Sequence, residues 1–325
     1  MIAYFKERNS FQVPALLFVT LALKLVFIYH PNTETLSQPG GLLSEWLSND
    51  ILPGLNPTFV TVVSLLILFL SALFANYLLV SCRMTGRNNL LVALSIILFT
   101  SLFPTTNQMS AATLLLPLII VLFRQITRLY NNAKVRPVII NIGMLTGAGY
   151  LLYHPFIWLL PCCFIGLAGM RAFRITEWLL LLLGFITPAY FLLSYEFLSN
   201  QWAPKAHLID WQVYHKFPFT NPYWWAAIAV LAIWILAAVP IWQQQMRRML
   251  IQSRKNWYQL IFMGIFILPM AIFPVGNASE ALTLFSFPAA SFAANAFTGE
   301  RTTLSVLFIW LIIAMIGVAS WIHFR

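Results

Sequence analysis

Three carboxylates occupy the first long polar gap of the chain, and they are its best candidates for catalysis. They are Glu34, Glu45 and Asp50. A carboxylate beside a membrane can deprotonate an acceptor hydroxyl as a general base, or hold a divalent cation against a lipid phosphate. The alternative is a solvated polar face, because residues 42–51 predict an amphipathic helix lying flat at the membrane surface. Its apolar face comprises Leu42, Leu43, Trp46, Leu47 and Ile51, and its polar face Ser44, Glu45, Ser48 and Asn49.

A second polar gap, residues 199–221, gathers imidazoles, a carboxylate and aromatic rings that are candidates for binding substrate. His207, Asp210 and His215 could form an oxygen and nitrogen metal site, but their spacing matches no established zinc motif, which favours ordinary loop residues. Trp202 and Trp211 could stack on a sugar ring, or act as aromatic anchors at the membrane interface.

Lys24 is the only basic residue well inside an apolar run. Charge within a membrane is costly, so it indicates a functional site by default. Because His30 lies six residues further on, the lysine stem could carry the ammonium group out to the headgroups. The alternatives are a contact with a lipid phosphate and a pair with Glu196. Lys24, His30 and His154 complete the predicted substrate-binding set.

Eleven apolar runs have to position these residues. A transmembrane helix needs about 20 apolar residues, and the runs lie at roughly 11–30, 58–81, 90–104, 110–123, 137–153, 156–170, 177–198, 222–243, 257–275, 282–298 and 303–324. Gly143 and Gly147 form a G-x-x-x-G pattern that predicts close helix packing within the chain. The predicted fold is all-α, a polytopic transmembrane bundle forming a single integral membrane domain over residues 1–325.

The lysines and arginines are distributed unevenly over the polar gaps between the apolar runs. Of the 19 Lys and Arg residues, 15 fall in every second gap. Positive charge is retained on the cytoplasmic side, which predicts a cytoplasmic N-terminus and a periplasmic C-terminus. All five histidines and six of the nine acids then lie on or near the outer side. Chemistry is therefore expected at the outer face, although inner loops too short to hold more residues would give the same pattern.

Composition excludes several classes of protein. The chain is 60% hydrophobic and 9% charged, far more apolar than a soluble core requires. The net charge of +10 does not predict nucleic-acid binding, because the charges are spread over alternate gaps. No nucleotide-binding G-x-x-x-x-G-K-[ST] motif and no G-x-S-x-G motif is present. No small-x-small site follows Tyr29, so the first run is predicted to be an uncleaved helix.

Several segments between Ser110 and Trp202 resemble a known family. They include Ala111-Ala112-Thr113-Leu114-Leu115-Leu116, Phe123-Arg124-Gln125-Ile126, Gly147-Ala148-Gly149-Tyr150-Leu151-Leu152-Tyr153-His154-Pro155, Arg171-Ala172-Phe173-Arg174-Ile175-Thr176-Glu177-Trp178 and Gly184-Phe185-Ile186-Thr187-Pro188. In these segments the chain resembles an uncharacterised family of polytopic inner-membrane proteins of Bacteroidota-type bacteria. The resemblance covers about the first two thirds of the chain.

The same stretch is similar, more weakly, to membrane glycosyltransferases of the GT-C type. That resemblance implies a multi-helix bundle with a cytoplasmic N-terminus, and a catalytic acid and interfacial helices in the first outer loop. It also implies a polyprenyl-phosphate-linked sugar as substrate. The paired acidic signature usual after the first helix is absent, because Glu34 stands alone. The implied function is sugar transfer at the outer face of the inner membrane, with Glu34, Glu45 or Asp50 as base or cation ligand.

Two other functions stay open from the sequence. One is a non-enzymatic membrane subunit or scaffold for envelope assembly, and the other is a transporter. A lipid-filled groove would favour the enzyme, and a flat outer face would favour the scaffold. Polar broken helices would favour the transporter. The expected partners are membrane lipids, including a polyprenyl-phosphate sugar, and envelope proteins, but not nucleic acid. A divalent cation is the only cofactor under consideration.

Overall fold

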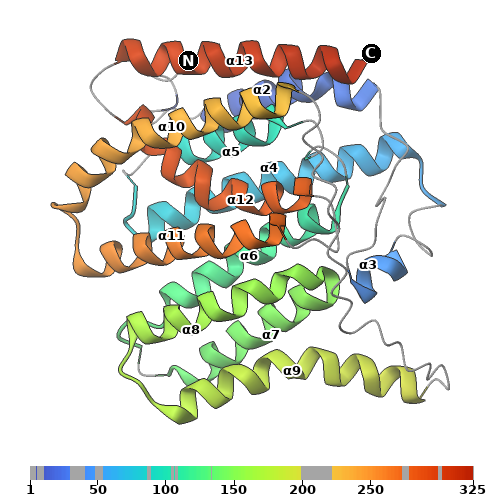
Figure 1. The fold of residues 1–325 in the computed structure, drawn as a ribbon, viewed down its shortest axis with the longest axis vertical. Helices are drawn as coiled ribbons and strands as arrows, with labels where there is room; N and C mark the ends of the chain where they lie inside the picture. Colours follow the sequence, from blue (N-terminus) through green and yellow to red (C-terminus); the bar gives the residue numbers. More distant parts are fainter. Residues whose placement is uncertain are drawn as a thin grey trace.

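The computed structural model describes residue 5 and residues 11–29, 41–47, 54–85, 89–103, 106, 109–132, 134–198, 222–272, 278–298 and 302–324. Over these ranges the regular structure is entirely helical, as the sequence predicts (Figure 1). The helices are α2 (Gln12–Tyr29), α3 (Leu42–Trp46), α4 (Pro57–Ser81), α5 (Leu91–Leu102), α6 (Ala111–Thr127), α7 (Arg136–Leu152), η4 (His154–Trp158), α8 (Leu159–Met170), α9 (Ile175–Leu198), α10 (Pro222–Met246), α11 (Ile251–Ile272), α12 (Ala278–Ala293), η6 (Ala294–Phe297) and α13 (Thr302–Phe324).

Each of the eleven predicted apolar runs overlaps one of the longer helices in the described ranges. Three helices are long and apolar enough to cross a membrane by length and composition, namely α4, α9 over Ile175–Tyr195, and α10. Shorter apolar helices accompany them. These features are those of a helical membrane protein, and the number of crossings stays a prediction.

Helix α5 lies inside the protein and does not face lipid. All twelve of its residues are buried, and it packs against α2, α4, α12 and α13. A helix of this length spans about 18 Å, well short of the roughly 30 Å hydrocarbon core of a bilayer. Because the last turn of α5 is buried, its free carbonyl groups need partners within the protein.

Glycines hold α7 against α9. A Cβ atom on Gly143 would meet the backbone carbonyl oxygen of Leu181 inside 3.0 Å, and one on Gly147 would meet that of Phe185. Gly184 approaches α7 equally closely from the other side. The predicted close packing within the chain at the G-x-x-x-G pattern is confirmed. Figure 1 shows this pair at one end of the molecule, with α2 and α13 at the other.

Hydrogen bonds join three of the basic gaps to one another. Arg171 Nη1 donates to the carbonyl oxygen of Asn132 at 3.0 Å, which connects the segment after α6 to the one after α8. Lys255 Nζ donates to the carbonyl oxygen of Gly169 at 2.9 Å, which adds the start of α11. Segments that are distant in sequence thus meet at one face, which we call the basic face.

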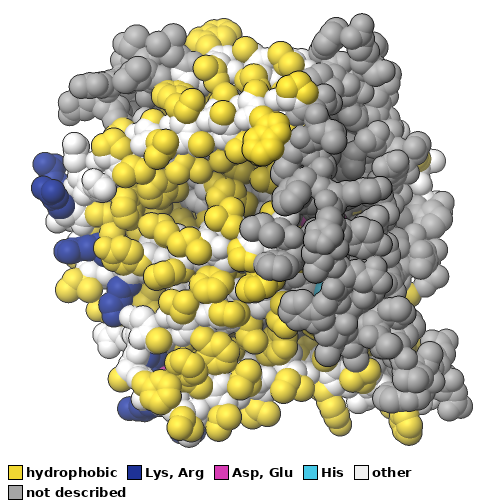
Figure 2. Space-filling view, viewed as in Figure 1, with side chains coloured by type: hydrophobic (Ala, Val, Ile, Leu, Met, Phe, Trp, Pro, Cys, Tyr) yellow, Lys and Arg dark blue, Asp and Glu magenta, His cyan; other side chains and the backbone are white. Residues whose placement is uncertain are grey.

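Two further hydrogen bonds join the other described basic gaps to this face. Ser253 Oγ donates to the carbonyl oxygen of Cys82 at 3.2 Å, and Gln245 Nε2 donates to Thr298 Oγ1 at 2.8 Å. Figure 2 shows lysine and arginine side chains along one edge of the molecule, beside a broad hydrophobic surface. The alternate gaps therefore do share a face. That this face is cytoplasmic stays a prediction.

Candidate functional site

Most of the candidate residues lie outside the part of the chain that the structure describes. They are His30, Glu34, Asp50, Trp202, His207, Asp210, Trp211 and His215, together with the side chains of Glu45 and Glu196. The first-loop acids and the 199–221 cluster are thus neither brought together nor separated. Lys24 and His154 are described, as is the helix that carries Glu45.

Helix α3 is held against the end of α7. The Gly41 backbone lies so close to the carbonyl groups of Leu151 and Leu152 that a Cβ atom there would fall inside 3.0 Å of them. Ser44 Oγ donates to the Gly41 carbonyl oxygen at 2.7 Å and accepts from its N–H at 2.9 Å. Ser44 is therefore buried, and the prediction that it lies on a solvated polar face is wrong. The packing of α3 on α7 is the reason, and it holds the helix that bears Glu45 next to the end of α7.

A buried carboxyl and a buried phenol that interact electrostatically each have an atom without a hydrogen-bond partner among the described residues. Glu280, in the first turn of α12, is 7% exposed, and its Oε2 has no hydrogen-bond partner among the described residues. Tyr153 follows α7 and interacts electrostatically with Glu280, and its hydroxyl likewise has no hydrogen-bond partner there. Buried polar groups are nearly always hydrogen-bonded. This pair is therefore a place where a ligand or water would complete the hydrogen bonding.

His154 is the next residue in the chain after Tyr153. It begins η4, and its ring meets that of Tyr150 edge-on with centroids 5.2 Å apart. The imidazole is thus fixed in place beside the Tyr153 backbone. Sequence reasoning selected His154 for its position in an outer gap, but it placed Tyr153 in the apolar run 137–153 and counted Glu280 only as one of the six outer acids. Tyr153 and Glu280 are far apart in the sequence, so no local pattern could predict their interaction.

Lys24 is buried in the protein. It is 1% exposed, and its Nζ donates to Thr100 Oγ1 at 3.1 Å. The prediction that its ammonium group extends to the headgroups is wrong, because α2 packs on α5 and turns this side chain inward. Thr100 lies in the last turn of α5, where the negative end of the helix dipole favours a cation. No sequence signal singled out Thr100, which is one hydroxyl within a predicted apolar run.

Side-chain donors close the buried end of α5. Tyr223 Oη, from the first turn of α10, donates to the Leu102 carbonyl oxygen. Thr106 Oγ1 donates to the carbonyl oxygen of Phe103 at 2.8 Å. Several polar side chains thus gather around the last turn of α5, in the interior of an otherwise apolar protein.

An apolar groove of about 280 Å³ lies between α10, α11 and α12. No charged side chain lines it, and Figure 2 shows that the surface in this view is mainly hydrophobic. Its lining includes Ile235, Trp242, Leu260, Gly264, Phe285 and Phe292. Phe285 lies five residues along α12 from Glu280, which is about 7.5 Å of helix. The groove can take a hydrocarbon chain, and Glu280 is not among the residues that line it.

The described residues contain no group of three or more His, Cys, Asp or Glu side chains that could hold a metal ion. The first-loop acids lie outside those residues, so the possible divalent cation stays a prediction.

Comparison with known proteins gives one family. The model of a family of unknown function (DUF6427) matches residues 50–323. The expected membership of an uncharacterised family is thereby confirmed, and the match extends into the final third of the chain. Tyr153, His154 and Glu280 lie within the matched range, whereas Lys24 and Glu34 lie before it. Comparisons with curated proteins and with solved structures gave no match.

Proposed function

The chain belongs to DUF6427, a family of unknown function, and we propose that it transfers a sugar from a polyprenyl-phosphate carrier at the face opposite the basic one. One observation carries the proposal. The buried Glu280 Oε2 and Tyr153 hydroxyl lie without hydrogen-bond partners among the described residues, and the same protein carries an apolar groove between α10, α11 and α12. A protein that holds both a buried polar centre and a hydrocarbon groove suits a substrate with a long apolar chain and a polar head.

The reaction needs a base at the acceptor and a site for the departing phosphate. A carboxylate takes the proton of the acceptor hydroxyl, and the acceptor oxygen forms a bond to the anomeric carbon. The bond between that carbon and the phosphate oxygen breaks, and polyprenyl phosphate leaves with the electron pair. Glu280 is the described candidate for the base. Glu34, Glu45 and Asp50 stay candidates for base or cation ligand, and Glu45 lies on the helix held against this corner.

The other residues take supporting roles in the proposal. His154 and Tyr153 hydrogen-bond the polar head of the substrate, and the prenyl chain occupies the groove. The segment 199–221 covers the acceptor, with Trp202 and Trp211 stacking on the sugar. Lys24 is assigned to packing, because its ammonium group binds the end of α5.

The buried end of α5 favours a second candidate function, transport of an anion. Helices that end within the membrane place their polar ends at the binding sites of many transporters. Here Lys24 supplies a cation at such an end, next to Thr100. In a transporter the lysine would bind the cargo, whereas in the transferase it is dispensable.

Native mass spectrometry of the gently solubilised protein tests the proposal. A Cβ on Gly264 would make ordinary contacts of 3.5 Å with Phe285 and Pro288, so Gly264→Phe is expected to fold and to fill the groove. Gly317→Phe is the matched control, because nothing lies within 4 Å of a Cβ there. Wild type and Gly317→Phe should retain a polyprenyl-phosphate lipid that Gly264→Phe loses. Bulk phospholipid alone in all three proteins would contradict the proposal.

A further inference from the structure

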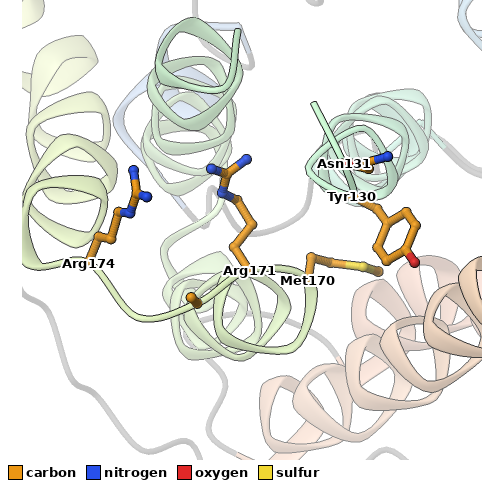
Figure 3. A pocket seen from close by; sticks show the side chains of 6 residues that line it. Tyr130, Asn131, Met170, Arg171 and Arg174 are labelled. Atoms are coloured by element: carbon orange, nitrogen blue, oxygen red, sulfur yellow. The ribbon is translucent and has the colours of Figure 1, made fainter. Parts of the chain in front are cut away.

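A pocket on the basic face is distinct from the site described above. It has a volume of about 440 Å³ and is lined by Tyr130, Asn131, Met170, Arg171, Ala172 and Arg174. Figure 3 shows both guanidinium groups extending to the same side from the segment that joins α8 to α9. Tyr130 and Asn131 come from the turn that follows α6.

The charges around the pocket favour an anion. Arg171 forms an ion pair with Glu177 at 3.4 Å and also donates to a backbone carbonyl, so this guanidinium is already engaged. Arg174 is exposed, and within the described ranges it has no ion-pair partner. Lys255 adds a third cation, with its Nζ 5.2 Å from the centre of the Tyr130 ring. Two arginines thus line the pocket and a lysine contacts one of its lining residues, whereas Glu177 is the one carboxylate that pairs with them among the described residues.

Apolar side chains next to the pocket indicate that it borders the membrane. Phe173 and Ile175 flank Arg174 in sequence, and each is 65% exposed. Phe173 is braced edge-on against Trp178, with ring centroids 5.0 Å apart. Arginines alternating with exposed apolar side chains at a helix start match the boundary between lipid headgroups and hydrocarbon.

We infer that this pocket binds the phosphate headgroup of an anionic phospholipid. Arg174 supplies the free guanidinium, whose planar pair of N–H donors matches two phosphate oxygens. Phe173 and Ile175 lie beside the acyl chains. A soluble phosphate compound shares the headgroup chemistry but makes no use of these exposed apolar side chains, so the lipid is the favoured ligand.

Titration of the delipidated protein with three probes tests this inference. The probes are phosphatidylglycerol, phosphatidylcholine and inorganic phosphate, and bound ligand is counted by native mass spectrometry. Arg174→Gln should weaken phosphatidylglycerol binding on the order of tenfold, because a charge-assisted hydrogen-bond pair is lost. Arg174→Lys keeps the charge but not the planar donor pair, so its affinity for phosphatidylglycerol should lie between those of the wild type and Arg174→Gln. Arg248→Gln is the matched control, since Arg248 is an exposed arginine outside the lining of the pocket.

Each outcome decides the inference. Selective binding of phosphatidylglycerol that is reduced by Arg174→Gln and unchanged by Arg248→Gln supports it. Equal binding of phosphatidylcholine, or equal losses in the two glutamine variants, overturns it. Binding of inorganic phosphate as tight as that of phosphatidylglycerol would assign the pocket to a soluble phosphate compound. Thermal unfolding of each variant verifies that the fold is intact.

Discussion

The close contact between α7 and α9 can be tested by adding a single methyl group. Gly143→Ala and Gly147→Ala each place a Cβ inside 3.0 Å of a backbone carbonyl of α9. A side chain could rotate away from the new methyl group, but a backbone carbonyl moves only with its helix. Either substitution should therefore push α9 outward and lose contacts along the whole interface.

Two opposing effects set the magnitude. Overpacking a close interface costs about 1–3 kcal/mol, and the rigid neighbours at Gly143 favour the upper end of that range. Replacing glycine by alanine inside a helix stabilises the helix by about 1 kcal/mol. The net loss should therefore be about 2 kcal/mol for each variant. Gly317→Ala has open space around it, so it should keep the helix gain alone.

Thermal unfolding of the three variants in one detergent, followed by tryptophan fluorescence, measures the difference. We expect Gly317→Ala to melt at or slightly above the wild-type temperature, and both α7 variants to melt several degrees below it. Equal melting temperatures for Gly143→Ala and Gly317→Ala would refute the close approach of the two helices. The control removes any general effect of glycine replacement on the unfolded chain.

Two further substitutions probe the buried end of α5. Lys24→Met should leave lipid binding unchanged and raise stability by about 1–4 kcal/mol, because methionine occupies a similar volume without the desolvation cost of an ammonium group. If Lys24→Met keeps its fold but no longer transports an anion, the result would instead support the transporter. Thermal unfolding verifies the fold, and lipid counting verifies that lipid binding is unchanged. Tyr223→Phe removes the hydroxyl that donates to the Leu102 carbonyl and should lower stability by about 1–2 kcal/mol in the same unfolding assay. An unchanged melting temperature would show that this carbonyl finds another donor.

The positions of the helices along the chain were largely predictable from the sequence. Apolar runs are local features, and every predicted run overlaps a helix. The sorting of lysine and arginine predicted that the alternate gaps share a face, and hydrogen bonds between Arg171 and Asn132 and between Lys255 and Gly169 bear that out. The G-x-x-x-G pattern also identified a close contact, although not its partner, α9.

The centre of the candidate site was not predictable in the same way. Tyr153 and Glu280 are far apart in the chain, and only the tertiary fold lets them interact. Lys24 lies near the end of a helix, which suggested exposure at the surface, but the packing of α2 on α5 decides its burial. Ser44 was assigned by helical periodicity to a polar face, yet the packing of α3 on α7 buries it. The packing of helices against one another determines which of these side chains are buried, and composition and periodicity do not predict that packing.

The most direct test of the proposed function is release of the carrier lipid. Protein reconstituted in liposomes would be supplied with a polyprenyl-phosphate-linked sugar, and free polyprenyl phosphate would be quantified by mass spectrometry. The account predicts release by wild type and a fall of about a hundredfold or more in Glu280→Gln, the scale of a lost general base. An intact carrier with wild-type protein, or equal release by Glu280→Gln, would contradict it.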